Sequence, residues 1–403
     1  MKFMIEKQSL LRELQYIAQT VIEKKGMIPA LSHIRIVASG KSVIRLSGTD
    51  LDQSLTCETE GVVQKGGACA LPGRKLFEIV KNLPEAVVHI ETKANDRAEV
   101  TCDRAQFKIA GLSANDFPEL PKFKEAVVQV PSDIMRQMIE RTRFAITQDE
   151  SRYALSGAKL ILRKKGVRMV TTDGHRLALI DNKTVTCAGE IDCLIPKKAL
   201  AAVFQLAAAH EGAIGIQKDD NHLYFEIGAR TLVARLLTGQ FPNYEQIIPK
   251  GNDHKIRFEC AELLQIVRRV AVMTDERTRA ICLEFKPKQL RVFVEEDGQG
   301  AAEETLDIPY DGAPTIIGMN ANYLAEYLSI VGAGTLNLEF KSPKDVVQIR
   351  PVGEAGYNSF ALVMPMRVGE TFETNPPSAS AAEQTKEEAV SESEESQSIP
   401  AAA

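Results

Sequence analysis

The chain has 403 residues, 44% of them hydrophobic and 26% charged, with a net charge of −5. This length predicts two or three domains, and the composition is that of a globular protein. No apolar run approaches the roughly 20 residues that cross a membrane, and the N-terminus lacks the apolar segment of a signal peptide, so we expect a cytoplasmic protein with no membrane partner.

The cysteines give no sign of a metal site or of a disulfide framework. All seven cysteines occur singly, without a CxxC pair and without a nearby pair of histidines. Zinc sites and disulfide-rich folds need such groupings. We therefore expect no metal and no cofactor.

The opening of the chain recurs twice. Residues 2–21, 127–146 and 255–274 each read as a short alternating strand, a polar turn and an amphipathic helix. The spacing of about 125 residues is the size of a small domain. The sequence therefore predicts three similar domains, at 1–125, 126–251 and 252–368, called here the first, second and third units.

A second helix follows in each unit, over 73–83, 197–208 and 321–331. Pro72 and Pro196 open two of these helices and Asn320 opens the third, and both residue types favour helix starts. Alternating runs such as 43–50 and 290–297 predict strands of half-buried antiparallel sheets. Each unit is therefore expected to be α+β, with two helices packed on antiparallel sheets.

The repeat separates shared features from features found once. The hairpin at 171–179, TTDGHRLAL, has counterparts at 46–55 and 294–303, and Asp50, Asp173 and Asp297 occupy matching places. Asp-Gly between strands is a turn signal, so Asp173 is interpreted as a turn residue. His175, Arg176 and Leu177 occur only in the second unit, and we assign a function to these three.

An enzyme that uses His175 as a base oriented by Asp173 is one alternative. It needs a nucleophile or a metal, and the sequence contains no GxSxG, HExxH or P-loop motif. We expect no catalytic residues.

The end of the third unit, Leu362 to Arg367 (LVMPMR), offers methionines around a proline, an adaptable apolar surface. If it meets the hairpin of the second unit, the two form a groove lined by apolar residues and rimmed by His175 and Arg176. The expected lining is Leu155, Leu177, Pro242, Ile247, Met364 and Met366. Such a groove suits a bound peptide better than a reaction.

The three-fold repeat, TTDGHRLAL, IPKKAL, GQFPNYEQIIPK and VMPMR together resemble the bacterial DNA sliding clamps, the beta subunit of DNA polymerase III. The resemblance covers residues 1–368. It implies the DNA clamp fold, a head-to-tail homodimer that forms a six-domain ring, and no catalytic activity of its own. Such a ring would encircle double-stranded DNA as a processivity factor and an accessory subunit of a DNA-directed DNA polymerase, which is a nucleotidyltransferase.

The resemblance also implies the site residues. A pocket for partner peptides would bind the replicative polymerase, the clamp loader, and other polymerases and repair factors. It falls on Leu155, Thr172, Gly174, His175, Arg176, Leu177, Pro242, Ile247, Leu362, Val363, Met364, Pro365, Met366 and Arg367. DNA would pass Lys25, Arg74, Gln148, Tyr153 and Lys198. The exposed dimer contacts would be Phe107 and Ile109 against Val272 and Met273.

Residues 369–403 depart from this family. Their composition of Ser, Ala, Pro and Glu predicts a disordered acidic tail with a net charge of −7, which leaves about +2 for the rest of the chain. The tail would repel DNA or recruit a partner, and the sequence does not choose between these roles. A protein scaffold that uses the same pocket without DNA remains the other alternative to a clamp.

Overall fold

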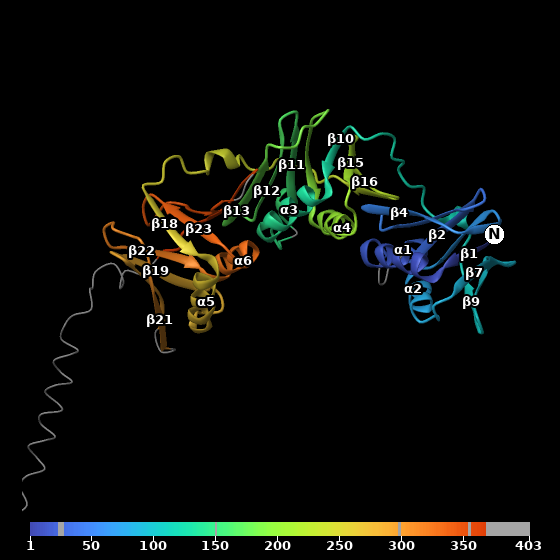
Figure 1. Cartoon of the computed structure of the whole chain (residues 1–403), viewed down its shortest axis with the longest axis horizontal. Coiled ribbons are helices and arrows are strands. Elements are labelled where there is room, and N and C mark those ends of the chain that lie inside the picture. The colour runs from blue at the N-terminus through green and yellow to red at the C-terminus, as the bar shows by residue number, and fades with distance from the viewer. Residues whose placement is uncertain (23–27, 150, 297–299, 354–355, 368–403) are drawn as a thin grey trace, which may run out of the picture.

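The computed structural model describes residues 1–22, 28–149, 151–296, 300–353 and 356–367. Three units of similar construction follow one another along an arc, and the six α-helices of these residues lie on its concave side (Figure 1). None of these helices combines the length and the apolar content that spanning a bilayer requires. Asp297, Gly298 and the predicted acidic tail lie outside the described residues.

The first unit begins with a strand and a helix whose buried face carries Leu10, Leu14 and Ile17. This spacing of three to four residues places one apolar stripe against the sheets. The elements of the first unit are β1 (Lys2–Glu6), α1 (Lys7–Thr20), β2 (His33–Ser39), β3 (Val43–Thr49), β4 (Gln53–Glu60), β5 (Val62–Lys65), β6 (Gly67–Pro72), α2 (Gly73–Lys81), β7 (Val87–Thr92), β8 (Arg97–Cys102) and β9 (Ala105–Ala110).

The second unit repeats this order. Its elements are β10 (Val128–Pro131), α3 (Ser132–Thr142), the 3-10 turns η3 (Arg143–Ala145) and η4 (Tyr153–Leu155), β11 (Gly157–Arg163), β12 (Gly166–Thr172), β13 (Arg176–Asn182), β14 (Ile191–Pro196), α4 (Lys197–Ala207), β15 (Ala213–Lys218), β16 (His222–Ile227), β17 (Arg230–Arg235) and the 3-10 turn η5 (Tyr244–Gln246).

The third unit ends the described chain. Its elements are β18 (His254–Glu259), α5 (Cys260–Val270), the 3-10 turn η6 (Ala271–Met273), β19 (Ala280–Lys286), β20 (Gln289–Glu296), β21 (Gly300–Asp307), β22 (Thr315–Asn320), α6 (Ala321–Val331), β23 (Thr335–Phe340), β24 (Val347–Pro351) and β25 (Tyr357–Val363).

The second helix of each unit starts close to the predicted residue. Asn320 caps α6, and its side chain accepts hydrogen bonds from the backbone N–H groups of Asn322 and Tyr323. Pro72 and Pro196 are the last strand residues and the caps of α2 and α4, one position before the first helical residue. The prolines therefore end a strand as well as precede a helix.

Two of the four sheets run across unit boundaries. In the first, β4 of the first unit pairs antiparallel with β17 of the second unit. In the other, β13 of the second unit pairs antiparallel with β25 of the third unit. One apolar core spans the first two units, and a second fills the third unit. The units are thus joined by continuous sheets rather than by flexible connectors alone.

Candidate functional site

The hairpin between β12 and β13 is held by the side chain of Asp173. One carboxylate oxygen accepts the backbone N–H groups of His175 at 2.9 Å and Arg176 at 3.0 Å. Gly174 has φ of 93°, which L side chains rarely adopt. In the first unit Asp50 accepts the N–H groups of Asp52 and Gln53 in the same way. Asp173 as a turn residue is confirmed.

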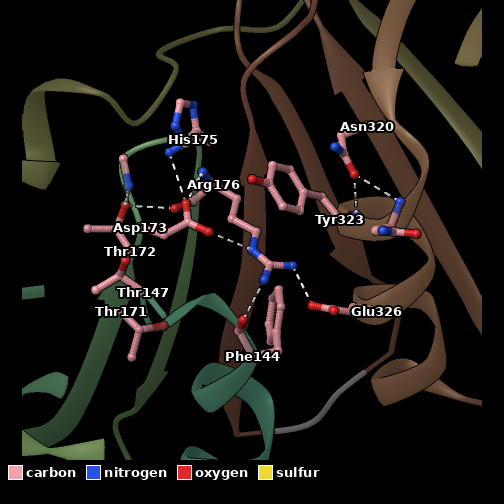
Figure 2. A network of polar contacts seen from close by, with 12 residues as sticks. Phe144, Thr147, Thr171, Thr172, Asp173, His175, Arg176, Asn320, Tyr323 and Glu326 are labelled. Atoms are coloured by element: carbon pink, nitrogen blue, oxygen red, sulfur yellow. Dashed lines mark hydrogen bonds and ion pairs between the residues drawn. The ribbon is translucent and has the colours of Figure 1, made fainter. Parts of the chain in front are cut away.

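This geometry counts against the catalytic alternative. The second carboxylate oxygen of Asp173 accepts Nε of Arg176 at 3.0 Å. Within the described residues, no hydrogen bond joins Asp173 to the imidazole of His175, whose side chain is exposed on the turn (Figure 2). A general base needs an orienting partner, and here the acid is committed to the backbone and to an arginine.

The hairpin and the end of the third unit meet, as the groove hypothesis required. Leu177 of β13 lies opposite Leu362 of β25 in the antiparallel register. Beyond the strand, the N–H of Met364 donates to the carbonyl of His175 at 2.9 Å, and the N–H of Met366 donates to the carbonyl of Gly318 at 2.8 Å. Residues almost 190 positions apart therefore form one surface.

An apolar cluster underlies this surface, and we call the cluster with its exposed margin the apolar platform. Its buried members are Val170, Leu177, Leu179, Leu194, Phe241, Tyr244, Phe360 and Leu362, and Leu155 and Ile248 pack against it. At the margin, Ile247 is 43% exposed and Met364 is 46% exposed. Pro242, Gly174, His175 and Arg367 are also exposed, and Pro365 and Met366 are half-buried. A short apolar segment of another protein can therefore cover these side chains.

Two residues predicted to line the pocket do not face it. Val363 is 1% exposed and packs in the core of the third unit. Neighbouring residues in a strand point to opposite faces, so Val363 faces away from the platform that Leu362 joins. Thr172 is buried, and its hydroxyl donates to the carbonyl of Arg176 at 2.6 Å, which makes it part of the turn.

Arg176 was expected at the rim of the groove, and this prediction is wrong. Its side chain is 9% exposed and lies between the second and third units (Figure 2). The guanidinium donates to Glu326 of α6 at 2.5 Å and to the carbonyl of Phe144 at 2.7 Å, besides Asp173. It also stacks 4.3 Å from the ring of Tyr323. Arg176 therefore ties the platform hairpin to α6.

Tyr323 forms the other side of this contact. Burial raises the pKa of its hydroxyl and the charge of Asp173 adds to this effect, whereas the charge of Arg176 acts in the opposite direction. The face of the ring attracts the Arg176 cation.

The positions expected to face DNA are exposed where they are described. Arg74 and Lys198 are the second residues of α2 and α4, and Gln148 accepts a hydrogen bond from Lys197 at the start of α4. Tyr153, in η4, is 71% exposed. Lys198 pairs with the carboxylate of Asp50 across the boundary of the first two units. Lys25 lies outside the described residues.

The expected dimer contacts lie at opposite ends of the arc (Figure 1). Phe107 of β9 is 37% exposed and Val272 of η6 is 78% exposed, as an unpaired interface requires. Met273 is half-buried. Ile109 was expected to be exposed, but it is buried at 4%. It packs in the core of the first unit, whereas Phe107, two residues earlier on the same side of β9, remains exposed.

Sequence reasoning missed the contact that joins the first two units. Arg230 of β17 forms two hydrogen bonds of 2.7 Å with the carboxylate of Glu13 on α1. The Glu13 side chain is 2% exposed and that of Arg230 is 12% exposed. Burial alone would raise the pKa of Glu13, but the hydrogen bonds and charges of Arg230 and Arg12 outweigh it and hold the pKa below its usual range.

Comparisons with known proteins agree along the described chain. Residues 1–121, 129–243 and 245–367 match the N-terminal, central and C-terminal domains of the DNA polymerase III beta subunit. A beta sliding clamp of Pseudomonas putida is 31% identical over 376 residues, which cover 91% of this chain and all of the relative.

Solved structures give the same result. The DNA polymerase III subunit beta of Pseudomonas aeruginosa superposes with a TM-score of 0.86 at 28% identity, over 91% of this chain and all of the other. A sliding clamp of the same organism, solved bound to griselimycin, has a TM-score of 0.85 at 29% identity and the same coverage.

Proposed function

The chain belongs to the family of the DNA polymerase III beta subunit, the sliding clamps, and we propose that it is a ring-shaped processivity factor that encircles duplex DNA and tethers the replicative polymerase to it. The polymerase, a DNA-directed nucleotidyltransferase, does the chemistry, and this chain supplies the link. We propose that the chain acts in the bacterial cytoplasm. The boundaries of the three units, at 1–125, 126–251 and 252–368, are also part of the proposal.

The observation that carries the proposal is the pairing rule at the two unit boundaries. At each, the strand after the Asp hairpin pairs antiparallel with the last strand of the next unit, β4 with β17 and β13 with β25. Two strands in the corresponding positions have no such partner among the described residues. They are β21, which follows the Asp hairpin of the third unit, and β9, the last strand of the first unit. Both are edge strands, and they lie at the two ends of the arc (Figure 1). The same rule, applied between two copies, closes a head-to-tail ring.

The repeat also gives the register of the new contact. In the first boundary, core-facing Leu55 lies opposite core-facing Leu232. Ala302 on β21 corresponds to Leu55, and Phe107 on β9 corresponds to Leu232. Each is matched by its pairing with the neighbouring strand and by the face of the sheet on which it lies. Phe107 of one copy would then lie over Ala302 of the other. Met273 belongs to η6, which contacts β21, so we expect Phe107 of one copy to approach Met273 of the other, the partner that the family resemblance implies.

Replacing Phe107 by serine is expected to open the ring. Loss of a phenylalanine from the centre of a contact removes about 2 kcal/mol or more of burial, and each of the two identical interfaces loses it. Sedimentation should show twice the chain mass for the wild type and a shift toward the single-chain mass for the variant at equal concentration.

Val62→Ser is the matched control, because Val62 is 57% exposed on β5, the opposite edge strand of the same sheet. It should keep the double mass. A Phe107→Ser protein that dimerises as tightly as the wild type would exclude the β9–β21 contact.

The concave face is suited to weak contact with DNA. Arg74, Lys198 and Tyr153 are exposed, and the first two stand at the starts of α2 and α4, which lie on the concave side (Figure 1). Contacts of this kind reach phosphates rather than base edges, so they are independent of sequence and weaken with salt. Retention then comes from the closed ring, which still slides.

The apolar platform is the proposed binding site for the polymerase, the clamp loader and repair factors. Replacing Met364 and Ile247 together by alanine should reduce stimulation of the replicative polymerase on a primed circular template at least about tenfold, since two exposed apolar anchors are lost. The same variant should bind griselimycin, the molecule bound to the Pseudomonas aeruginosa relative, more weakly.

Val352→Ala serves as the control, because Val352 is an exposed apolar residue just beyond β24 of the same unit. Both variants should still form dimers and remain on circular DNA. Full stimulation by the double variant, or a loss of DNA retention, would contradict the assignment of the platform.

A further inference from the structure

A hollow of about 410 Å³ lies where the second unit meets the third, on the concave side, and we call it the seam hollow. Its lining comes from η3 of the second unit and from α5 and α6 of the third: Arg143, Phe144, Arg268, Asn322, Glu326, Ser329 and two apolar neighbours. Two consecutive units build it jointly, from residues that are far apart in the sequence. Nothing in the pocket or the DNA path described so far uses it.

Two arginines of the lining, Arg143 and Arg268, have no carboxylate partner among the described residues. Within the described residues, neither Arg143 nor Arg268 forms an ion pair, and both are exposed. Arg143 is held over the ring of Phe204 at 4.6 Å, and Arg268 donates to the hydroxyl of Ser329 at 3.1 Å. The adjacent Arg269, in contrast, is paired with Glu304. Two arginines without an ion-pair partner among the described residues therefore line one hollow.

The single acidic residue of the lining is already engaged. Glu326 accepts Nη1 of Arg176 at 2.5 Å, which draws its carboxylate toward the platform hairpin (Figure 2). The ion pair reduces the repulsion that this carboxylate would exert on an anion. Arg176 thus acts on the hollow as a positioning residue, through Glu326.

The repeat shows that the arrangement is not a requirement of the fold. At the boundary of the first two units, Ala18 stands at the position of Arg143 by the repeat spacing, and Ala202 stands at that of Glu326. There the side chain of Gln205 donates a hydrogen bond of 2.7 Å to that of Gln19 across the boundary. The charged hollow therefore belongs to one boundary only.

We propose that the seam hollow binds a phosphate group of the encircled duplex, with Arg143 and Arg268 as its donors. A guanidinium presents paired N–H groups that match phosphate oxygens, and the amide of Asn322 adds a neutral donor. Asn322 is the second residue of α6, so it is the counterpart of Arg74 and Lys198 in the other units. This inference rests on the proposed clamp function and adds a DNA contact to it.

The test is the salt dependence of DNA binding. Dimers of the wild type and of an Arg143→Ala/Arg268→Ala variant are titrated with a fluorescein-labelled duplex, by anisotropy, between about 20 and 200 mM NaCl. Loss of the one phosphate contact made by each hollow should lower the slope of log K against log[salt] by about 1 if the duplex touches one hollow at a time, and weaken binding about tenfold at low salt.

Arg269→Ala is the matched control, because Arg269 is the next residue but is paired with Glu304. It should leave the slope unchanged, and all three proteins should keep the double mass and the same melting temperature. A double variant with the slope of the wild type would overturn the inference while leaving the clamp function intact. A wild type that shows no salt-dependent binding would instead contradict the clamp function itself.

A second arm separates DNA from a free anion. Inorganic phosphate is titrated into ¹⁵N-labelled protein while the arginine side-chain signals are followed by NMR. If phosphate binds the wild type and not the double variant, and the DNA slope is unchanged, the hollow is a small-anion site and the DNA assignment is wrong. A lowered DNA slope supports the proposal whether or not free phosphate also binds.

Discussion

Replacing Arg230 by alanine should lower the free energy of unfolding by about 3 to 5 kcal/mol, the largest single effect expected in this chain. The variant leaves the Glu13 carboxylate buried, with the exposed Arg12 as its remaining charged partner. It also removes the stacking of the guanidinium on Tyr16. Because α1 and β17 belong to different units, the loss should loosen the first boundary of the arc. Urea unfolding followed by circular dichroism measures it.

The exposed pair of Arg45 and Glu58 supplies the control. Both side chains are almost half exposed, so Arg45→Ala should cost no more than about 1 kcal/mol. Replacing both members of the buried pair, as Glu13→Gln/Arg230→Met, should cost less than Arg230→Ala alone, since no charge is left without a partner. Equal losses for Arg45→Ala and Arg230→Ala would show that the buried pair does not hold the boundary.

The same pair gives a pH dependence. The folded pKa of Glu13 is held below its unfolded value, so the unfolded chain binds the proton more readily. The stabilisation is therefore complete above the unfolded pKa of about 4.3 and is lost as the pH falls through the lower folded value. In the Glu13→Gln variant this part of the acid destabilisation should disappear.

Replacing Arg176 by alanine should have the second largest effect, about 3 kcal/mol of unfolding free energy together with a loss of partner binding. The guanidinium serves Asp173, Glu326 and the carbonyl of Phe144 at once, and it stacks on Tyr323. Without it the hairpin that carries His175 and Leu177 loses its fixed position against α6. Urea unfolding and polymerase stimulation should therefore both fall.

An Arg176→Lys variant should recover little of this loss, because one ammonium group cannot donate to three acceptors in the way that a planar guanidinium does. His175→Ala is the neighbouring control, since the His175 side chain is exposed, and its stability should stay within about 0.5 kcal/mol of the wild type. Wild-type stability and stimulation in Arg176→Ala would mean that the contact between hairpin and α6 is dispensable.

Much of the fold could be predicted because short stretches of sequence specify its helices and turns, and because these stretches recur in three units. Apolar periodicity marks the helices, Asn320 caps α6 as its type suggests, and Asp173 turns the hairpin by accepting two backbone N–H groups. The repeat spacing then orders these elements into units. The meeting of the second hairpin with the last strand entered as a hypothesis about features that occur only once, and the pairing of β13 with β25 confirms it.

Two of the errors, at Val363 and at Arg176, concern the direction in which a side chain points. Leu362 and Val363 are neighbours in a strand, so only one of them can face the platform, and alternation could have shown this from the sequence. The inward turn of Arg176 could not have been found so easily, because its partner Glu326 lies 150 positions away. The seam hollow depends on the same kind of distant contact.

The most direct test of the clamp function asks how the protein is held on DNA. The dimer is placed by its clamp loader on a nicked circular plasmid, separated from free protein by gel filtration, and the plasmid is then cut once. A ring that encircles the duplex stays on the circle in moderate salt and leaves after the cut, unless the ends are blocked. Retention on the linear plasmid with open ends, or no retention on the circle, would contradict the account.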